Sequence, residues 1–177
     1  MEESLLKAMR SLETGVCHIY HKKFDDWTND RLLEYIAEPT DDRLYAIAQL
    51  IRGGVDLVLI YNRTKIDMFF LEKFKNIVEF ERVVEAAPMD IEVLREAKRM
   101  GFSDKFIGQL WGVSQHDMYL LREKNGIFPV YKMIDTCASE FSSYVPYFYS
   151  TYEDENESLV SDKEKIVVLG SGPIRIG

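Results

Sequence analysis

Three groups of residues in this sequence have types or spacings that could carry chemistry. Cys137 could act as a nucleophile. His18 and His21 are three residues apart, as metal ligands can be, and Gly170–Gly177 is a glycine-rich loop. Backbone N–H groups of such a loop can bind phosphate. Each of these chemistries needs partner groups at short distance, and the rest of the sequence must supply them.

Neither the cysteine nor the histidine pair has the partners that its chemistry requires. A cysteine nucleophile needs a base within hydrogen-bond reach, and every histidine precedes Cys137 in the chain. His18 and His21 have no further ligand at a metal-binding spacing. We therefore predict a buried, unreactive thiol at Cys137, a partly exposed turn at His18 and His21, and no catalytic or metal-binding residue. An enzyme that uses Cys137 is an alternative.

The glycine loop follows a continuous apolar run, Lys165–Leu169. Its spacing, with glycine at Gly170, Gly172 and Gly177, matches neither the dinucleotide fingerprint nor the P-loop. An apolar strand that leads into a glycine-rich turn is typical of the start of a parallel α/β sheet. We predict an orphan β-strand there, that is, a strand whose partner strands lie outside this chain. The three glycines are candidates for a cofactor-binding loop, but we expect this chain alone to bind no cofactor.

The segment Phe102–Leu121 is similar to a helix-turn-helix motif. A short helix, a turn at Gly112 and a helix cap at Ser114 all fit that motif. However, the second helix would begin with Gln115 and His116 and has no basic residue at its start to contact phosphates. The net charge of −8 also disfavours duplex binding. We predict no nucleic-acid partner, and a free-standing helical adaptor is the alternative hypothesis.

The composition is that of a globular protein with a core. The chain has 177 residues, of which 46% are hydrophobic and 29% charged, enough for one domain or two small ones. It contains no apolar run near the roughly 20 residues of a membrane span and no signal-peptide pattern at its start. Two distant cysteines without a secretion signal indicate a reducing compartment. We expect a cytoplasmic protein with no membrane partner.

Helical periodicity runs through most of the first ~125 residues. Side chains of the N-cap type precede several apolar repeats, and Pro88 should end the longest helix because the residue before proline disfavours helix. The expected helices are one around Leu5–Leu12, three that begin at caps Thr28, Thr40 and Asp90, and the longest from about Lys65 to Ala87.

An internal repeat relates two parts of this helical region. Gly54-Val55-Asp56 reappears about 47 residues later as Gly101-Phe102-Ser103. Each is a helix-ending glycine, then an apolar residue, then a cap. A potential capping box follows each, at Thr64–Asp67 and at Ser114–Asp117. We predict a duplication that forms two similar helical subdomains packed on each other; chance similarity of caps is the alternative.

The composition changes after Gly126. Pro129 and Pro146 interrupt helices, aromatic residues crowd 144–152, and 153–157 is acidic. We predict an extended tail whose aromatic residues pack onto the helices or onto another domain. The predicted fold is all-α, an irregular array of two similar subdomains with an extended C-terminal tail. Its parts are a helical domain at 1–152, an acidic linker at 153–164, and the truncated first strand and glycine loop of a following domain at 165–177.

Six motifs in a fixed order resemble the large subunit of carbamoyl phosphate synthetase. They extend over nearly the whole chain. The motifs are Ala8–Gly15, Thr64–Asp67, Gly101–Asp104, Tyr131–Phe141, Pro146–Glu153 and Val168–Gly177. The chain departs from the common family pattern at Val145, Phe148 and Ile174, which concerns the subfamily rather than membership.

The resemblance implies a role between two catalytic halves. In that family an all-helical oligomerization or connection domain joins two ATP-grasp halves, and the parent ligase makes carbamoyl phosphate from bicarbonate, two ATP and glutamine-derived ammonia for arginine and pyrimidine synthesis. The resemblance also implies that the parent uses ATP with Mg or Mn, and K. The implied partners are the flanking halves, a small glutaminase subunit and further copies. The family's ligands for these substrates lie in the ATP-grasp halves, so the chain itself is expected to be non-catalytic; Arg10 and Gly170–Gly177 border the halves as candidate couplers.

Overall fold

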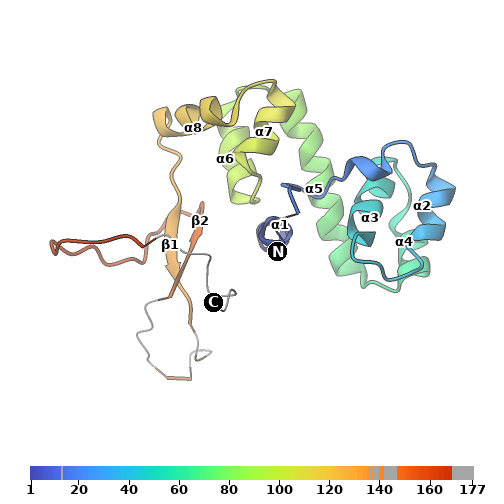
Figure 1. The fold of residues 1–177 in the computed structure, drawn as a ribbon, viewed down its shortest axis with the longest axis horizontal. Coiled ribbons are helices and arrows are strands. Elements are labelled where there is room, and N and C mark those ends of the chain that lie inside the picture. Colours follow the sequence, from blue (N-terminus) through green and yellow to red (C-terminus); the bar gives the residue numbers. More distant parts are fainter. Residues whose placement is uncertain (13, 136, 138–139, 142–146, 169–177) are drawn as a thin grey trace.

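The computed structural model describes residues 1–177 except 13, 136, 138–139, 142–146 and 169–177. The described residues are mainly helical, which confirms the all-α prediction (Figure 1). The elements are α1 (Glu2–Ser11), a 3₁₀ helix (Lys22–Phe24), α2 (Asn29–Tyr35), α3 (Arg43–Arg52), α4 (Leu57–Thr64), α5 (Met68–Ala86), α6 (Ile91–Arg99), α7 (Asp104–Trp111), α8 (Gln115–Lys124), β1 (Val130–Met133) and β2 (Phe148–Thr151). Among the described residues, none of the helices has the length and apolar character needed to span a membrane.

The long helix α5 connects two groups of helices. Figure 1 shows α2, α3 and α4 around one end of α5 and α6, α7 and α8 around the other, with α1 beside it. Helices α1, α3, α4, α6 and α7 all contact α5. The buried side chains of α5 repeat along one side of the helix from Leu71 through Ile77 to Val84, because both groups place their cores against it. At the second end, the Trp111 Nε1–H donates to the Val84 carbonyl oxygen at 2.6 Å.

The two groups share the same backbone turn at equivalent positions. Gly54 and Gly101 have φ angles of 78° and 88°. In each turn the N–H of the next residue donates to a carbonyl five residues back, from Val55 to Leu50 at 3.0 Å and from Phe102 to Ala97 at 2.9 Å. This is the Schellman arrangement, in which a left-handed residue ends the helix. An eight-residue helix follows each turn, α4 or α7. The shared geometry favours duplication over chance similarity of caps.

The expected helix from Lys65 to Ala87 is wrong at its start. Lys65 has a left-handed φ of 56° and ends α4, and α5 begins only at Met68. The Thr64 hydroxyl donates back to the Ile60 carbonyl oxygen at 2.8 Å, and Asp67 caps α5 by accepting from the Phe69 N–H at 2.8 Å. The predicted capping box at Thr64–Asp67 is therefore wrong, because the threonine is used to close the preceding helix.

Three of the other predicted helix caps are confirmed and one is wrong, depending on which group the side-chain oxygen contacts. Thr28 caps α2, Asp90 caps α6, and Ser114 with Asp117 forms a complete capping box at α8. Thr40 does not cap α3. Its hydroxyl donates to Asp42 Oδ1 at 3.1 Å, and Asp42 is the residue at the N-cap position. Prediction of that cap fails because a neighbouring side chain competes for the hydroxyl.

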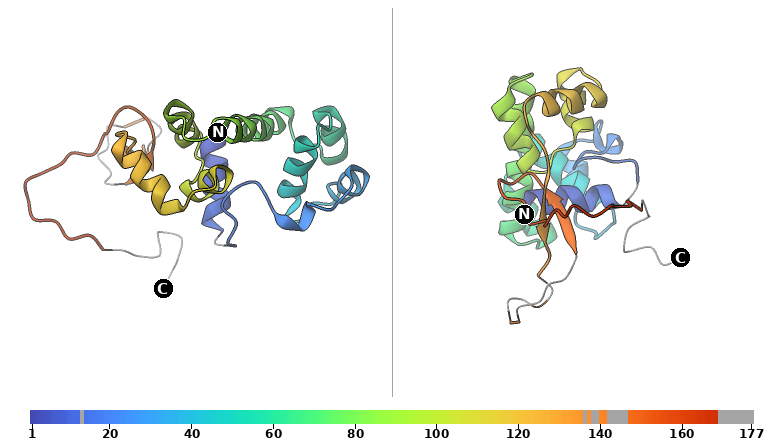
Figure 2. Two further views of the ribbon diagram at one scale, coloured as in Figure 1. Left: turned by 90° about the horizontal axis from the view of Figure 1, so that it is seen from above. Right: turned by 90° about the vertical axis from the view of Figure 1, so that its left-hand side faces the viewer.

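The tail contains a short antiparallel sheet that the sequence did not predict. Val130 lies opposite Thr151, and Met133 opposite Phe148. The acidic segment 153–157, which comes after β2 in the chain, lies beside β1, where the Glu157 N–H donates to the Tyr131 carbonyl oxygen at 2.8 Å. Residues 158–168 then extend away from the helices (Figure 2). Lys165–Val168, the described part of the predicted orphan strand, has no strand assignment, and Ile166 is 92% exposed.

Candidate functional site

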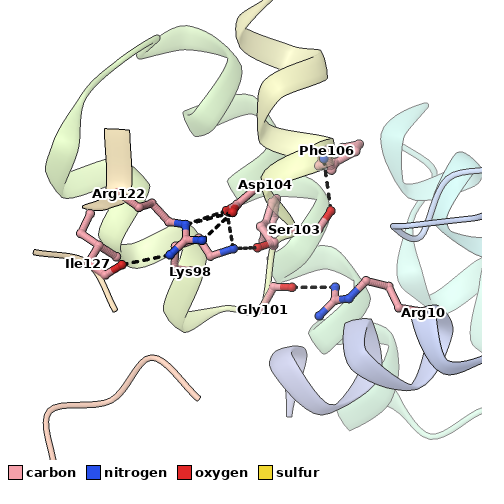
Figure 3. A network of polar contacts seen from close by, with 9 residues as sticks. Arg10, Lys98, Gly101, Ser103, Asp104, Phe106, Arg122 and Ile127 are labelled. Carbon is pink, nitrogen blue, oxygen red and sulfur yellow. Dashed lines mark hydrogen bonds and ion pairs between the residues drawn. The ribbon is translucent and has the colours of Figure 1, made fainter. Parts of the chain in front are cut away.

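A half-buried carboxylate, Asp104, binds two cations at the second group of helices (Figure 3). Lys98 of α6 approaches Asp104 Oδ1 at 2.8 Å, and the Arg122 guanidinium of α8 contacts both carboxylate oxygens, with its Nη2 at 2.7 Å from Oδ2. The same guanidinium donates to the Ile127 carbonyl oxygen at 3.0 Å. Asp104 is the first residue of α7. We call Lys98, Asp104 and Arg122 the Asp104 cluster; it links three helices and the start of the tail.

The tail and α1 both contact the surroundings of the Asp104 cluster. The Tyr152 ring lies 4.9 Å from Lys98 Nζ and 5.5 Å from the centre of the Arg122 guanidinium, which are cation–π distances. Arg10 of α1 donates to the Gly101 carbonyl oxygen at 2.8 Å. The contacts of Tyr152 agree with the prediction that aromatic residues of the tail pack on the helices or on another domain, whereas Tyr147 and Tyr149 are 61% and 45% exposed.

A second carboxylate, the buried Glu81 of α5, joins the first group of helices to the segment after α1. Arg52 of α3 binds it through two nitrogens, at 2.8 Å and 2.7 Å, and donates to the Ile19 carbonyl oxygen at 2.9 Å. His18 Nε2 lies 2.9 Å from Glu81 Oε1. The imidazole is only 2% exposed and stacks on Phe106 with ring centroids 3.7 Å apart. We call His18, Arg52 and Glu81 the Glu81 cluster.

Burial and ion pairing shift the pKa values in both clusters. Burial alone would raise the pKa of Glu81, but hydrogen bonds from Arg52 and His18 outweigh it and lower that pKa. Burial would likewise raise the pKa of Asp104, and the bonds from Arg122 together with Lys98 lower it. Burial lowers the pKa of His18. Both carboxylates are thus held ionised by cations, an arrangement that suits cross-linking of helices.

These shifts predict a loss of stability in acid. The folded pKa of His18 lies below its ordinary value of 6.5, so the unfolded chain binds a proton there first as the pH falls. The folded pKa values of Glu81 and Asp104 also lie below their ordinary values of 4.5 and 3.8, so the unfolded chain again binds more protons. The free energy of unfolding should therefore decrease as the pH falls, first below about 6.5 and then below about 4.5.

Urea unfolding at about pH 7.5 and about pH 5.5 tests the histidine contribution separately. We expect His18→Leu to reduce the difference in unfolding free energy between these two pH values. His116→Leu, on the exposed start of α8, is the control for removal of an imidazole and should retain the difference. A wild-type free energy that is equal or higher at the lower pH would contradict the assignment.

The described sequence-predicted candidates do not form one catalytic or metal-binding site. His18 is buried in the Glu81 cluster, contrary to the expected partly exposed turn, and His21 Nδ1 instead accepts from the Lys23 N–H at 3.1 Å. Cys137 is half-buried rather than buried, and its N–H donates to Asp135 Oδ1 at 2.9 Å. Gly170, Gly172 and Gly177 lie outside the described residues. Within the described part of the chain, no group of three or more Asp, Glu, His and Cys side chains is placed to hold a metal ion.

The helix-turn-helix geometry predicted for Phe102–Leu121 is present. Gly112 adopts a left-handed φ of 68° between α7 and α8. Gly108 lies in the packing between them, since a Cβ there would meet the Val113 carbonyl oxygen at 2.7 Å. The exposed start of α8 carries Gln115 and His116.

Sequence reasoning missed both ion clusters. Their members are far apart in the chain, as His18 and Glu81 are. One signal was available. Lys98 and Arg122 occur at inward-facing positions of amphipathic helices, and a charged residue at such a position requires a buried partner.

Comparison with known protein families identifies a match over the helical part of the chain. Residues 1–126 match the sequence model of the family described as carbamoyl-phosphate synthetase large chain, oligomerisation domain. The matched region contains all eight described α-helices and both ion clusters, and it ends at the turn after α8.

Proposed function

Because the chain belongs to the family of carbamoyl-phosphate synthetase large-chain oligomerisation domains, we propose that it is a non-catalytic module that connects catalytic parts and self-associates. The family match is the observation that carries this proposal. It is supported by the two buried ion clusters, whose carboxylates are occupied by cations from neighbouring helices. Groups held in this way stabilise the arrangement of the helices and are poorly placed to accept a substrate proton.

The proposed parent is the glutamine-dependent ligase that makes carbamoyl phosphate for arginine and pyrimidine synthesis in the cytoplasm. Its ATP, Mg or Mn and K, and bicarbonate would bind in the flanking ATP-grasp halves, and a glutaminase subunit would supply ammonia. The exposed apolar run Ile166, Val167 and Val168 supports the proposal that this segment pairs as a strand with another domain of the parent, since such a row is stable only when covered.

The surface that supports association is formed by exposed apolar residues of α4 and of the first turn of α5, two helices that contact each other. Val58 and Leu59 of α4 are 54% and 51% exposed, and Phe69 of α5 is 52% exposed. Several exposed apolar side chains on contacting helices are typical of protein–protein contacts. We name these residues, with Phe70, the α4–α5 corner, and propose that it is covered in the assembly.

Sedimentation velocity over a range of concentrations tests the association. We expect the chain to form dimers or larger species as concentration rises, and Leu59→Asp with Phe69→Asp to weaken this at least tenfold, because each charge would be buried in the contact. Leu120→Asp on α8, where the leucine is similarly exposed at 45%, is the matched control. A chain that stays monomeric at all concentrations would contradict self-association. Bicarbonate-dependent ATP hydrolysis by the purified chain would contradict the non-catalytic role.

A further inference from the structure

A cavity lies between the segment after α1 and the outer face of α7. It has a volume of about 310 Å³, in the range of small-ligand sites. Val16 and Phe106 supply apolar wall, and Gln109 supplies an amide. The cavity is outside the α4–α5 corner, and of its described lining residues His18 alone belongs to an ion cluster.

Two lysines at this cavity lack an anionic partner. Lys22, from the 3₁₀ helix, and Lys105, from the first turn of α7, both line it. Among the described residues, the structure gives neither ammonium group an ion pair or a hydrogen bond. By contrast, Lys23, the neighbour of Lys22, is bound to Asp42 at 2.6 Å. Two lysine ammonium groups without an anionic partner at one cavity create a local region of positive potential.

The composition of the cavity wall is unusual for this chain. The chain carries a net charge of −8, and four other cavities among the described residues each have at least one aspartate or glutamate in their wall. The described residues that line this cavity include none. A bound anion would therefore meet attraction from the lysines without repulsion from a described carboxylate of the wall.

Two histidines add to the lining. His21 Nδ1 accepts from the Lys23 N–H at 3.1 Å, so in the neutral imidazole the hydrogen is on Nε2, which is then a donor. His18 lines the inner side, with Nε2 at Glu81 and with no partner for Nδ1 among the described residues. The cavity thus brings together two ammonium groups, an imidazole N–H and an amide.

We propose that this cavity is a binding site for a small phosphate-bearing anion. Two separate ammonium groups suit a dianionic tetrahedral group, whereas a planar carboxylate is best matched by the fork of an arginine, and no described arginine lines the cavity. The Gln109 amide and the His21 Nε2–H supply further donors. The apolar wall of Val16 and Phe106 accommodates an organic substituent on the phosphate.

Titration of the ¹⁵N-labelled chain with inorganic phosphate and with pyrophosphate tests the proposal. The amide signals of Gly15 and Gln109, on opposite walls of the cavity, should shift in a saturable manner at constant ionic strength. The double variant Lys22→Gln, Lys105→Gln should bind pyrophosphate at least tenfold more weakly, because each charge-assisted hydrogen bond is worth roughly a factor of ten.

Lys124→Gln is the matched control, since this exposed lysine at the end of α8 is not part of the cavity. It removes one positive charge and should leave pyrophosphate binding unchanged. Retained chemical shifts outside the cavity would show that the double variant is folded. Absence of saturable shifts with both probes would overturn the proposal, as would equal binding by the double variant and the wild type, or equal loss in Lys124→Gln. Self-association is measured separately by sedimentation, so either proposal can fail alone.

Discussion

Replacement of Asp104 by alanine is expected to lower the free energy of unfolding by about 3–5 kcal/mol. The substitution leaves Lys98 and Arg122, whose side chains are 6% and 9% exposed, with their positive charges buried and unpaired. It also removes the link between α6, α7 and α8. Urea unfolding followed by circular dichroism measures the change.

Asp154→Ala is the matched control for this prediction. Asp154 pairs with Arg99 at 2.6 Å, close to the 2.7 Å between Asp104 and Arg122, but the Asp154 side chain is 85% exposed. Water screens exposed pairs, so its loss should cost at most about 1 kcal/mol. A triple variant with Asp104→Leu, Lys98→Met and Arg122→Met should recover much of the loss, because no charge is then left unpaired. Similar costs for Asp104→Ala and Asp154→Ala would show that burial of the cluster does not decide its contribution.

Gly101→Ala is expected to destabilise the chain strongly, by about 2–5 kcal/mol. A φ of 88° strains any residue with a Cβ, at a cost of roughly 1–2 kcal/mol. In addition, a Cβ at this position would come within 2.8 Å of the Glu3 Cα, so α1 would have to move, and overpacking of this kind costs about 1–3 kcal/mol. The displacement would also disturb the hydrogen bond from Arg10 to the Gly101 carbonyl oxygen.

The internal repeat supplies the control for this substitution. Gly54 occupies the equivalent turn with a φ of 78°, and a Cβ there would meet no atom within 4 Å. Gly54→Ala should therefore show the conformational cost alone, roughly 1–2 kcal/mol. Amide hydrogen exchange should accelerate in α1 for Gly101→Ala and remain unchanged for Gly54→Ala. Equal destabilisation by the two variants would contradict a tight contact between α1 and the turn at Gly101.

The predictable parts of the fold were those set by neighbouring residues. Asp90 and Ser114 cap their helices through bonds to residues two or three positions ahead, so the sequence alone indicates them. Pro88 correctly predicted the end of α5 at Ala86, because proline restricts the backbone of the residue directly before it. Thr40 and Thr64 were misassigned because each hydroxyl chose another nearby acceptor, and local sequence does not rank such competitors.

The parts that escaped prediction depend on residues far apart in sequence. Pairing of β1 with β2 joins residues such as Val130 and Thr151, and the Glu81 cluster joins His18 to a helix that begins 50 residues later, at Met68. Such contacts follow only from the assembled helices. The phosphate-bearing ligand site proposed above is of the same kind, because Lys22 and Lys105 become neighbours through folding.

The position of α5 between the two helical groups has a consequence for how the chain loses its structure. A duplicated protein whose copies keep separate cores can melt one copy at a time. Here α5 contributes buried side chains to both groups of helices, from Leu71 at one end to Val84 at the other. Loss of structure in either group would therefore remove packing from the other, so we expect the two groups to unfold together as one cooperative unit.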